Sequence, residues 1–475
     1  MRASILFPTY SHSGNLSVPV NLQQEKRAVS TLAALYSLRM LGLFLVLPVM
    51  SLYGMQYEGS SPMLIGIAMG MYGATQAVLQ MPLGVLSDRI GRKSVIIGGL
   101  LMFIAGSVVA ALSTSIYGLI IGRALQGSGA ISGTLMAMVS DLTSEQNRTK
   151  AMATIGACIG LSFGVSMLLG PVFTHFGGLS GLFWITALLG LAGMLLVFFV
   201  LPEPPAETLH CPHRDTLPVP ALLWRVLCDS QLVRLNSGIF CLHMVLMASF
   251  VVVPHLLEKQ LGLDRQHHWE VYLPVLGGSF VAMIPLMIIG EKKRLVKQVF
   301  VFAVGALVFA LLFLGAAYQF NAALLSGLFL FFFAFNLLEA QLPSLISKQS
   351  FAGGRGTAMG VYSTSQFIGT FAGGALGGLM LHVGEPRWLF WMLALPAAGW
   401  CWLAATMQEP RYLLNVMLPF AGDPEAMRLR LQGMPGVAEV LVVAEEQIAY
   451  LKVDDTICDR AALDGACAGY SPHAG

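Results

Sequence analysis

Isolated titratable residues within long apolar runs are the groups in this sequence best suited to carry chemistry. Glu339, in FFFAFNLLEAQLP, is the one acid well inside such a run, where a carboxylate would be costly to ionise against hydrocarbon. We therefore expect Glu339 to face a cavity and to be the leading proton carrier. His243 and Arg39 also lie deep in apolar runs. A lone histidine on an apolar helix is usually hydrogen-bonded packing, so His243 ranks second. Arg39 could supply a countercharge or attract an anionic group.

A second set of polar residues lies elsewhere in the apolar runs. Arg123 and Gln126 occur in RALQGSGA. An arginine within a span usually faces a cavity or an acid, but one so close to the outer boundary could also extend its side chain to the surface. We favour the functional role. Four further polar residues are expected to add contacts to an otherwise apolar cavity: Gln76, Gln80, Asn336 and Gln366.

The polar segment GVLSDRIGRK, here named the latch loop (84–93), separates two long apolar runs. Gly84 would let a helix approach a neighbour closely, and Gly91 permits a tight reversal, so the loop must join antiparallel helices. Asp88 is its one acid. Positive charge resists translocation across a membrane, which places the loop in the cytoplasm. Its three cations are Arg89, Arg92 and Lys93.

The composition is that of a membrane protein. Of 475 residues, 56% are hydrophobic and 11% are charged, and the mean hydropathy is +0.72, values outside the usual range of soluble domains. A net charge of +2 gives no field that would attract nucleic acid. The seven cysteines form no C-x-x-C pair or regular spacing, so we expect no disulfide framework, no metal site and no cofactor. The first 29 residues lack the pattern of a cleaved signal peptide.

Twelve apolar segments are each long enough to cross a hydrocarbon core of about 30 Å as a helix. The first six are 30–52, 62–86, 94–112, 116–139, 151–173 and 180–201. The other six are 235–257, 270–290, 296–317, 321–346, 356–381 and 388–407. We therefore predict four regions: an N-terminal cytoplasmic segment (1–29), a first six-helix half (30–201), a cytoplasmic linker (202–232) and a second six-helix half (233–407).

Lysine and arginine are distributed unequally between alternate loops of this layout. The outside loops hold only Lys259, Arg265 and Arg387. The inside loops hold Arg89, Arg92, Lys93, Arg148, Lys150, Arg214, Arg225, Arg234, Lys292, Lys293, Arg294, Lys297, Lys348 and Arg355. Because cytoplasmic loops carry the excess of positive charge, both termini are expected in the cytoplasm.

The two halves share short sequence echoes. Pro82, Leu83 and Asp88 recur as Pro285, Leu286 and Glu291 with the same internal spacing. RTKAM, from Arg148, recurs as RGTAM, from Arg355. Two matches in the same order favour an internal duplication, as in transporters built from two parallel halves. The second copy of the latch loop has lost its glycine turn.

Beyond Pro410 the charge density becomes that of a soluble domain. Tyr412 to Phe420 is a predicted strand, and Asp423 and Pro424 begin a helix that runs to about Gln432. Two strands, 437–443 and 448–453, and a short helix at about 456–468 follow. The order βαββα predicts a cytoplasmic ferredoxin-like domain over 411–470. The loop after the first strand has no cysteine pair, so a copper site is not expected.

The motifs carry a resemblance to a known family. The latch loop resembles G-x-L-x-D-R-x-G-R-K of the major facilitator superfamily, RALQG resembles the R-x-x-Q-G motif of the same superfamily, and Gly170-Pro171 is similar to the motif of its drug/proton antiporters. With the βαββα tail, the chain looks like the YajR type of bacterial inner-membrane transporter. The resemblance implies an all-α membrane fold of twelve helices in two six-helix halves, with a small α+β ferredoxin-like domain.

The resemblance also implies roles for the latch loop. Asp88 would sit near Gly356, at the start of span 11, where the positive end of a helix favours an anion and would hold the outward-facing state. Arg92 could pair with Asp141 at the inner end of span 4.

Span 5 carries a row of glycines that would give it a smooth face for close helix packing: Gly156, Gly160, Gly164 and Gly170.

The leading functional prediction is proton-coupled export of a small amphipathic compound by alternating access, without enzymatic activity. The expected partners are that substrate, protons, the lipid bilayer, and an unidentified partner or ligand of the C-terminal domain. Metabolite uptake or uniport is an alternative, and a membrane sensor that signals through the C-terminal domain is another. An intramembrane enzyme is least favoured, because no paired aspartates, H-E-x-x-H or G-x-S-x-G motif occurs.

Overall fold

A computed structural model of the protein describes residues 22–143, 145–174, 177–202, 220–410, 412–420, 422–444, 446–454, 457–459, 462–463 and 465. The chain divides into two compact units. The helical unit comprises Gln23–Ser350 and Gly354–Arg411, and the smaller unit contains Tyr412–Gly475 together with Phe351–Gly353.

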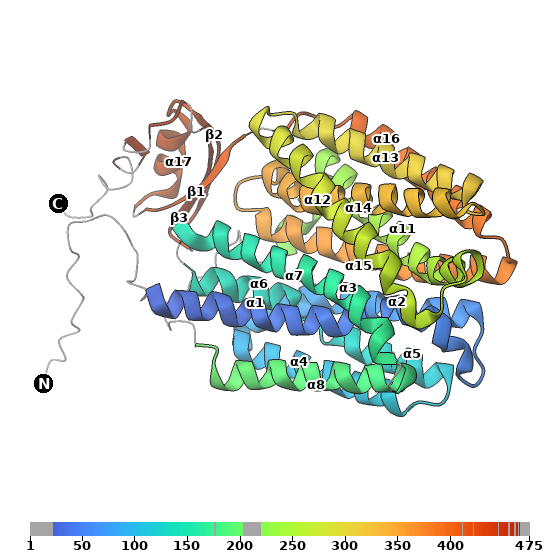
Figure 1. Ribbon diagram of the computed structural model, residues 1–475. Coiled ribbons are helices and arrows are strands. Elements are labelled where there is room, and N and C mark those ends of the chain that lie inside the picture. The colour runs from blue at the N-terminus through green and yellow to red at the C-terminus, as the bar shows by residue number, and fades with distance from the viewer. Residues whose placement is uncertain are drawn as a thin grey trace, which may run out of the picture. The chain divides into compact units, whose positions relative to one another are not determined.

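The helices of the first half of the chain lie together in the lower part of Figure 1. They are α1 (Leu22–Leu45), α2 (Leu47–Tyr53), the 3-10 helix η1 (Gly54–Gln56), α3 (Pro62–Ile90), α4 (Arg92–Leu112), α5 (Ile116–Ser128), α6 (Ser132–Leu142), α7 (Glu145–Thr174) and α8 (Gly178–Phe199). Each of the first six predicted spans coincides with one of these helices or with a consecutive pair.

The helices of the second half lie above them in the same view (Figure 1). They are α10 (Pro220–Cys228), α11 (Ser230–Leu261), the 3-10 helix η2 (Arg265–His267), α12 (Trp269–Lys292), α13 (Val296–Ala317), α14 (Asn321–Gln349), α15 (Arg355–Val383) and α16 (Pro386–Ala405). The last six predicted spans coincide with α11 to α16. The short helix α10 lies in the segment predicted as a linker, and the sequence analysis missed it.

Ten helices of the described chain are long and apolar enough to cross a membrane. Two of the twelve predicted spans are not among these ten helices, and each is left out for a local reason. Span 116–139 is divided between α5 and α6 by a break at 129–131, and span 356–381 corresponds to α15, which is rich in glycine and polar residues. The first span is also interrupted, at Val46, just before Pro48 at the start of α2.

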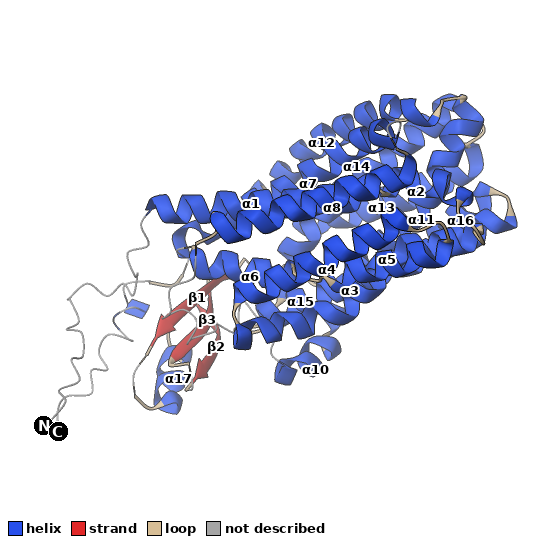
Figure 2. Cartoon of the chain, turned by 90° about the horizontal axis from the view of Figure 1, so that it is seen from below, coloured by secondary structure: helices blue, strands red, loops and turns tan. Residues whose placement is uncertain are grey.

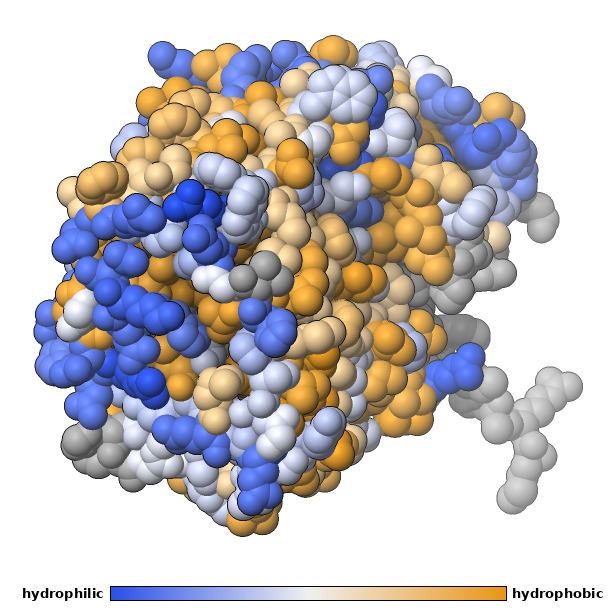
Figure 3. Space-filling view, turned by 90° about the vertical axis from the view of Figure 1, so that its right-hand side faces the viewer, coloured by the Kyte–Doolittle hydropathy of each residue, from blue (hydrophilic) through white to orange (hydrophobic). Residues whose placement is uncertain are grey.

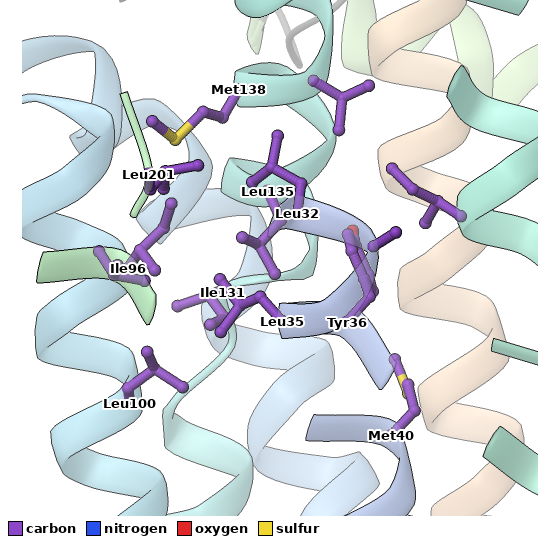
Figure 4. Packing of buried hydrophobic residues seen from close by; sticks show 14 of the residues in the cluster. Leu32, Leu35, Tyr36, Met40, Ile96, Leu100, Ile131, Leu135, Met138 and Leu201 are labelled. Carbon is purple, nitrogen blue, oxygen red and sulfur yellow. The ribbon is translucent and has the colours of Figure 1, made fainter. Parts of the chain in front are cut away.

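A buried apolar core holds the first half together. Most of its side chains come from α1, α4 and α6, others come from α3, α7 and α8 and from Leu201 after α8, and those drawn in Figure 4 interdigitate. The labelled members are Leu32, Leu35, Tyr36, Met40, Ile96, Leu100, Ile131, Leu135, Met138 and Leu201. Packing across these helices therefore fixes the position of Arg39, which lies on α1 between Tyr36 and Met40.

The two halves meet mainly where α3 packs along α15, with further contacts between α2 and α11 and between α7 and α12. The approach of α3 to α15 depends on glycine. A Cβ atom at Gly66 would overlap the carbonyl oxygen of Gly374, and one at Gly374 would overlap the carbonyl oxygen of Gly66. The backbones can come this close only because neither residue has a side chain.

Large apolar side chains remain exposed on the outside of the helical unit. In Figure 3, which views the helical unit from the end where its helices stop, orange side chains lie among groups of blue ones. Leu395 is 74% exposed and Trp402 is 68% exposed. A soluble protein rarely exposes so much contiguous apolar surface. This surface is what a protein that faces lipid requires.

The smaller unit is a three-stranded antiparallel sheet with one helix on a face (Figure 2). Its elements are β1 (Leu414–Pro419), α17 (Pro424–Gln432), β2 (Val437–Val443) and β3 (Ile448–Val453), with strand order β1-β3-β2. The side chain of Asp423 caps α17 by accepting hydrogen bonds from the backbone of Glu425 and Ala426. These elements confirm the predicted strand, helix, strand, strand order. The predicted helix at about 456–468 falls mostly outside the described residues.

The two faces of the sheet are covered differently. Met427 and Leu431 of α17 pack on one face, against Leu451 and its neighbours. On the other face, Tyr450 packs with Ala352, a residue of the short segment that belongs to this unit. The backbone N–H of Ala352 also donates to the Glu439 carboxylate at 3.0 Å. No feature of the sequence predicted that segment as part of this domain.

Candidate functional site

Three helices bring Glu339, His243 and Gln366 together. Glu339 comes from α14, His243 from α11 and Gln366 from α15. Oε2 of Glu339 is 3.8 Å from Nε2 of His243, and Nε2 of Gln366 donates to Oε1 of Glu339 at 3.5 Å. Gln366 Nε2 is also 2.8 Å from His243 Nε2. Glu339 therefore lies against two neighbouring helices, with 37% of its side chain exposed.

Among the described residues, the buried polar atoms of this cluster that lack a hydrogen-bond partner include Oε2 of Glu339 and the hydroxyl of Tyr362, a residue of α15 within electrostatic range of Glu339. A buried oxygen without a donor disfavours the charged carboxylate. Nearby in sequence, Asn336 donates to Ser279 of α12 at 3.0 Å.

Aromatic rings from both halves meet one helical turn along α14 from Glu339. Phe163 of α7 lies with its ring centroid 6.1 Å from that of Phe250 on α11 and 6.4 Å from that of Phe335 on α14. The Phe335 ring is in turn 6.1 Å from the His243 ring. On its other side, Phe163 packs edge-on against Phe44 at 5.1 Å. The surroundings of Glu339 are thus largely apolar and aromatic on this side.

Arg39 lies in a polar cluster inside the first half. The side chain is 1% exposed, and its guanidinium donates to the Ser132 hydroxyl at 2.8 Å and to the Tyr72 hydroxyl at 3.0 Å. It also donates to Oε1 of Gln76 at 3.2 Å and to the carbonyl of Gly129 at 3.1 Å. All of these acceptors are neutral. Arg39 thus joins α1 to α3 and to the break between α5 and α6.

Arg123 and Gln126 form a second buried cluster. The Arg123 side chain is 1% exposed, its guanidinium lies 5.2 Å from the centroid of the Tyr72 ring, and it donates to Oε1 of Gln126 at 2.8 Å. Gln126 in turn donates to the Ser107 hydroxyl at 2.8 Å. The alternative in which Arg123 extends to the outer surface is therefore wrong, because α3 covers it. Tyr72 contacts both arginines, and nothing in the sequence singled it out.

The latch loop is a single-residue reversal between two helices. α3 ends at Ile90, Gly91 has φ of 92°, and α4 begins at Arg92. A positive φ of this kind favours glycine, which explains why the turn can be so short. Arg89 is exposed, whereas Lys93 is partly buried. The reversal places Arg92 at the start of α4, beside the last turn of α3.

Arg92 links two carboxylates from different helices. It forms an ion pair with Asp88 on α3, and its Nε donates to Oδ2 of Asp141 on α6 at 3.1 Å. Its Nη1 also donates to the Ser87 hydroxyl at 2.6 Å. The predicted pairing of Arg92 with Asp141 is confirmed. Ser87 was missed, because a serine within an apolar pattern gives no signal of its own.

In this conformation the ion pair of Asp88 is with Arg92, and no hydrogen bond between Asp88 and Gly356 is found among the described residues. A Cβ built at Gly84 would meet no atom within 4 Å, so this glycine does not mediate a close helix approach in this conformation. The docking of Asp88 at the start of α15 was predicted for the outward-facing state. It stays a prediction for a conformation other than this one.

The glycine pattern of α7 was predicted to mediate close packing, and here it does so only in part. Gly156, Gly160 and Gly164 have no atom within 4 Å of a built Cβ, so at these positions the prediction is wrong for this conformation. Gly170 differs, because its built Cβ lies 2.7 Å from the carbonyl oxygen of Leu45, where α1 ends. Pro171 follows it within the helix. The pair thus lies against the break in the first span.

The chain matches two family models. Residues 32–373 match the model of the Major Facilitator Superfamily, and residues 414–468 match that of the YajR YAM domain. The chain is 48% identical to the inner membrane transport protein YajR of Escherichia coli, over 93% of this chain and 97% of that protein.

More distant proteins share the fold. The multidrug resistance protein MdtH of Aeromonas salmonicida is 28% identical, over 74% of this chain and 88% of its own length. A solved structure of the nucleoside transporter NupG superposes with a TM-score of 0.64 at 12% identity, covering 80% of this chain and 99% of that one. At that identity the superposition speaks for the fold alone.

Proposed function

Because this chain belongs to the major facilitator superfamily and is a multi-pass inner-membrane transport protein, we propose that it exports a small amphipathic compound in exchange for protons. One central site would open to each side of the membrane in turn. The observation that carries the proposal is the carboxyl group of Glu339, held between α11 and α15 with one buried oxygen that lacks a donor.

Proton binding would couple to transport through the charge of Glu339. When the carboxylate is protonated, the site loses its negative charge, so the free-energy cost of keeping the Glu339 side chain away from water is lower. When the proton leaves, the charged site favours a conformation in which water or a substrate group reaches it. His243 and Gln366 hold the carboxyl group in place, and the aromatic rings around Phe163 offer an apolar surface to the substrate.

The latch loop would set the balance between the two conformations. Arg92 holds Asp88 and Asp141 together in this state. In the opposite state, Asp88 would dock at the start of α15, near Gly356, where the helix dipole favours an anion. We place the latch loop and both termini in the cytoplasm, as the distribution of lysine and arginine suggests.

The buried arginines would serve the first half rather than the substrate directly. Arg39 and Arg123 are enclosed by neutral acceptors, so their charges act on the central site at a distance. Gln76 belongs to the same cluster. Gly170 and Pro171 would let the first span bend at its break while the halves move. The C-terminal domain would bind a ligand or partner of its own.

Transport by purified protein in proteoliposomes tests this function. An imposed pH gradient should drive flux of at least one compound from a panel of drugs and metabolites, and Glu339→Gln should reduce that flux to background. Glu385→Gln is the control, since Glu385 is exposed and, among the described residues, forms an ion pair with the nearby Arg387. A wild-type flux that does not change with the imposed pH gradient would favour uptake or uniport instead. Partners that bind the C-terminal domain without any flux would favour a sensor.

A further inference from the structure

A cation of the second half lies at the end of a helix in the first half. Arg265, in η2, donates from Nη1 to the carbonyl oxygen of Leu52 at 3.1 Å. Its guanidinium carbon is 5.2 Å from the centroid of the Tyr53 ring. A third contact stays within the second half, where Nε donates to Oε1 of Glu258 at 2.6 Å.

The position of Leu52 makes the contact with Arg265 favourable. Leu52 and Tyr53 are the last two residues of α2, so the Leu52 carbonyl is among those that the helix itself leaves without a partner. The C-terminal end of a helix carries a partial negative charge that attracts a cation. The face of a tyrosine ring also attracts a guanidinium. Glu258 orients Arg265 from the other side.

The contact belongs to a wider closure of the two halves at the same end of the helical unit. α2 packs on α11, and η2 packs on α7. At the opposite end, a Cβ built at Gly84 meets no atom within 4 Å, and the ion pair of Asp88 is with Arg92 of the same half. Arg265 therefore lies at the end of the molecule where the halves are closed.

We propose that Arg265 is a gating residue that holds this end of the transporter shut. This proposal extends the alternating access proposed above. It assigns to each end of the transporter a contact between a charged side chain and a helix end, with the signs of charge reversed between the two ends. At the latch loop, an anion of the first half would dock at the positive start of a helix in the second half. At the far end, a cation of the second half docks at the negative end of a helix in the first half. Only one of the two contacts would form at a time.

Spin-label distances across the closed end test the proposal without any substrate. Met55 in η1 and Glu270 in α12 are exposed residues on opposite halves at this end. Each is replaced by a labelled cysteine in a full-length background that lacks the seven native cysteines. A helix-end contact of this kind shifts a two-state equilibrium by about 2-fold to 30-fold. Arg265→Gln should therefore raise the ratio of long to short distances by that factor.

Three further variants make the result specific. Arg265→Lys keeps the charge but loses the planar stacking on Tyr53 and should lie between the wild type and Arg265→Gln. Tyr53→Leu removes only the ring and should give a smaller rise in the ratio of long to short distances. This variant tests the proposal if Arg265→Gln does not fold. Arg387→Gln is the matched control, because Arg387 pairs with Glu385 inside the second half, and its distances should not change.

The proposal is overturned if folded Arg265→Gln, or Tyr53→Leu together with Arg265→Lys, gives the wild-type distance distribution. It is also overturned if Arg387→Gln opens the end equally. The variants are compared with the wild type at one fixed pH and without any flux, so a failure of Glu339 as the proton carrier would leave this comparison intact.

Discussion

At the scale of single residues, the latch loop and its counterpart in the second half each form an ion pair at the end of a helix, but with different charged residues. In the first half, Arg92 bridges Asp88 and Asp141. At the spacing set by the two sequence echoes, Glu291 corresponds to Asp88 and Lys348 to Asp141. Lys348 donates directly to both oxygens of Glu291, at 2.8 and 3.1 Å. With a cation in place of the second acid, no bridging arginine is needed.

Loss of the bridging arginine should therefore cost more than loss of its counterpart. Arg92→Gln leaves Asp88 and Asp141 as two partly buried carboxylates without their shared cation, and we expect the free energy of unfolding to fall by about 2 kcal/mol. Glu291→Gln breaks a half-exposed pair and should cost less than about 1 kcal/mol. Thermal unfolding in detergent measures both. Equal losses in the two variants would show that Arg92 is an ordinary surface cation.

The site residues show how far single-residue reasoning from sequence reaches. Glu339 and His243 stood out because titratable groups are rare in apolar helices, and Asp141 was found from its motif context. Tyr72 and Tyr362 gave no signal, since a tyrosine in an apolar helix is common and only its neighbours in space reveal a polar role. Arg265 was predicted only as an outer-loop cation, because its partner Leu52 is a backbone carbonyl.

At the scale of helices, the contact between α3 and α15 depends on the absence of side chains. Gly66 and Gly374 face each other's backbone, so that an added methyl group at either would overlap a carbonyl oxygen. The sequence predicted a glycine face on α7 instead, where three of the four glycines have open space. Spacing shows that a helix could pack closely, but not which neighbour it will meet.

Alanine substitutions should separate these two kinds of glycine. Gly66→Ala forces α3 and α15 apart, and we expect a loss of about 1–3 kcal/mol or a failure to fold. Gly160→Ala in α7 adds a methyl group to open space and should be neutral or slightly stabilising, because alanine favours helix. Yield of monodisperse protein and thermal unfolding are the measurements. If both variants behave alike, α3 does not require its close approach.

Most element boundaries could be predicted from sequence because the segments between spans are polar and short. Strands β2 and β3 were predicted at their observed bounds, since apolar runs end at clear turn residues. The breaks at Val46 and at 129–131 were missed, because apolar residues continue through both. These breaks lie where Arg39 and Gly170 find their partners, so the least predictable backbone is close to the proposed machinery.

At the scale of the whole molecule, the account is of two halves that close one end at a time around Glu339. In the present conformation, Arg265 joins the halves at one end, whereas at the other end the ion pairs that Arg92 forms with Asp88 and Asp141 lie within the first half. Sequence could predict the two halves but not how they are rotated against each other. That rotation decides which side chains of α11, α14 and α15 converge on the site.

The most direct test of this account is the distance between labels at positions 55 and 270, measured as a function of pH in the substrate-free protein. Glu339 has a buried oxygen without a donor in this conformation, so protonation should favour it. Acidification from about pH 8 to about pH 5 should raise the short-distance population in the wild type, while Glu339→Gln should show the short distance at every pH. A pH response that survives in Glu339→Gln, or a wild type without any response, would contradict the account.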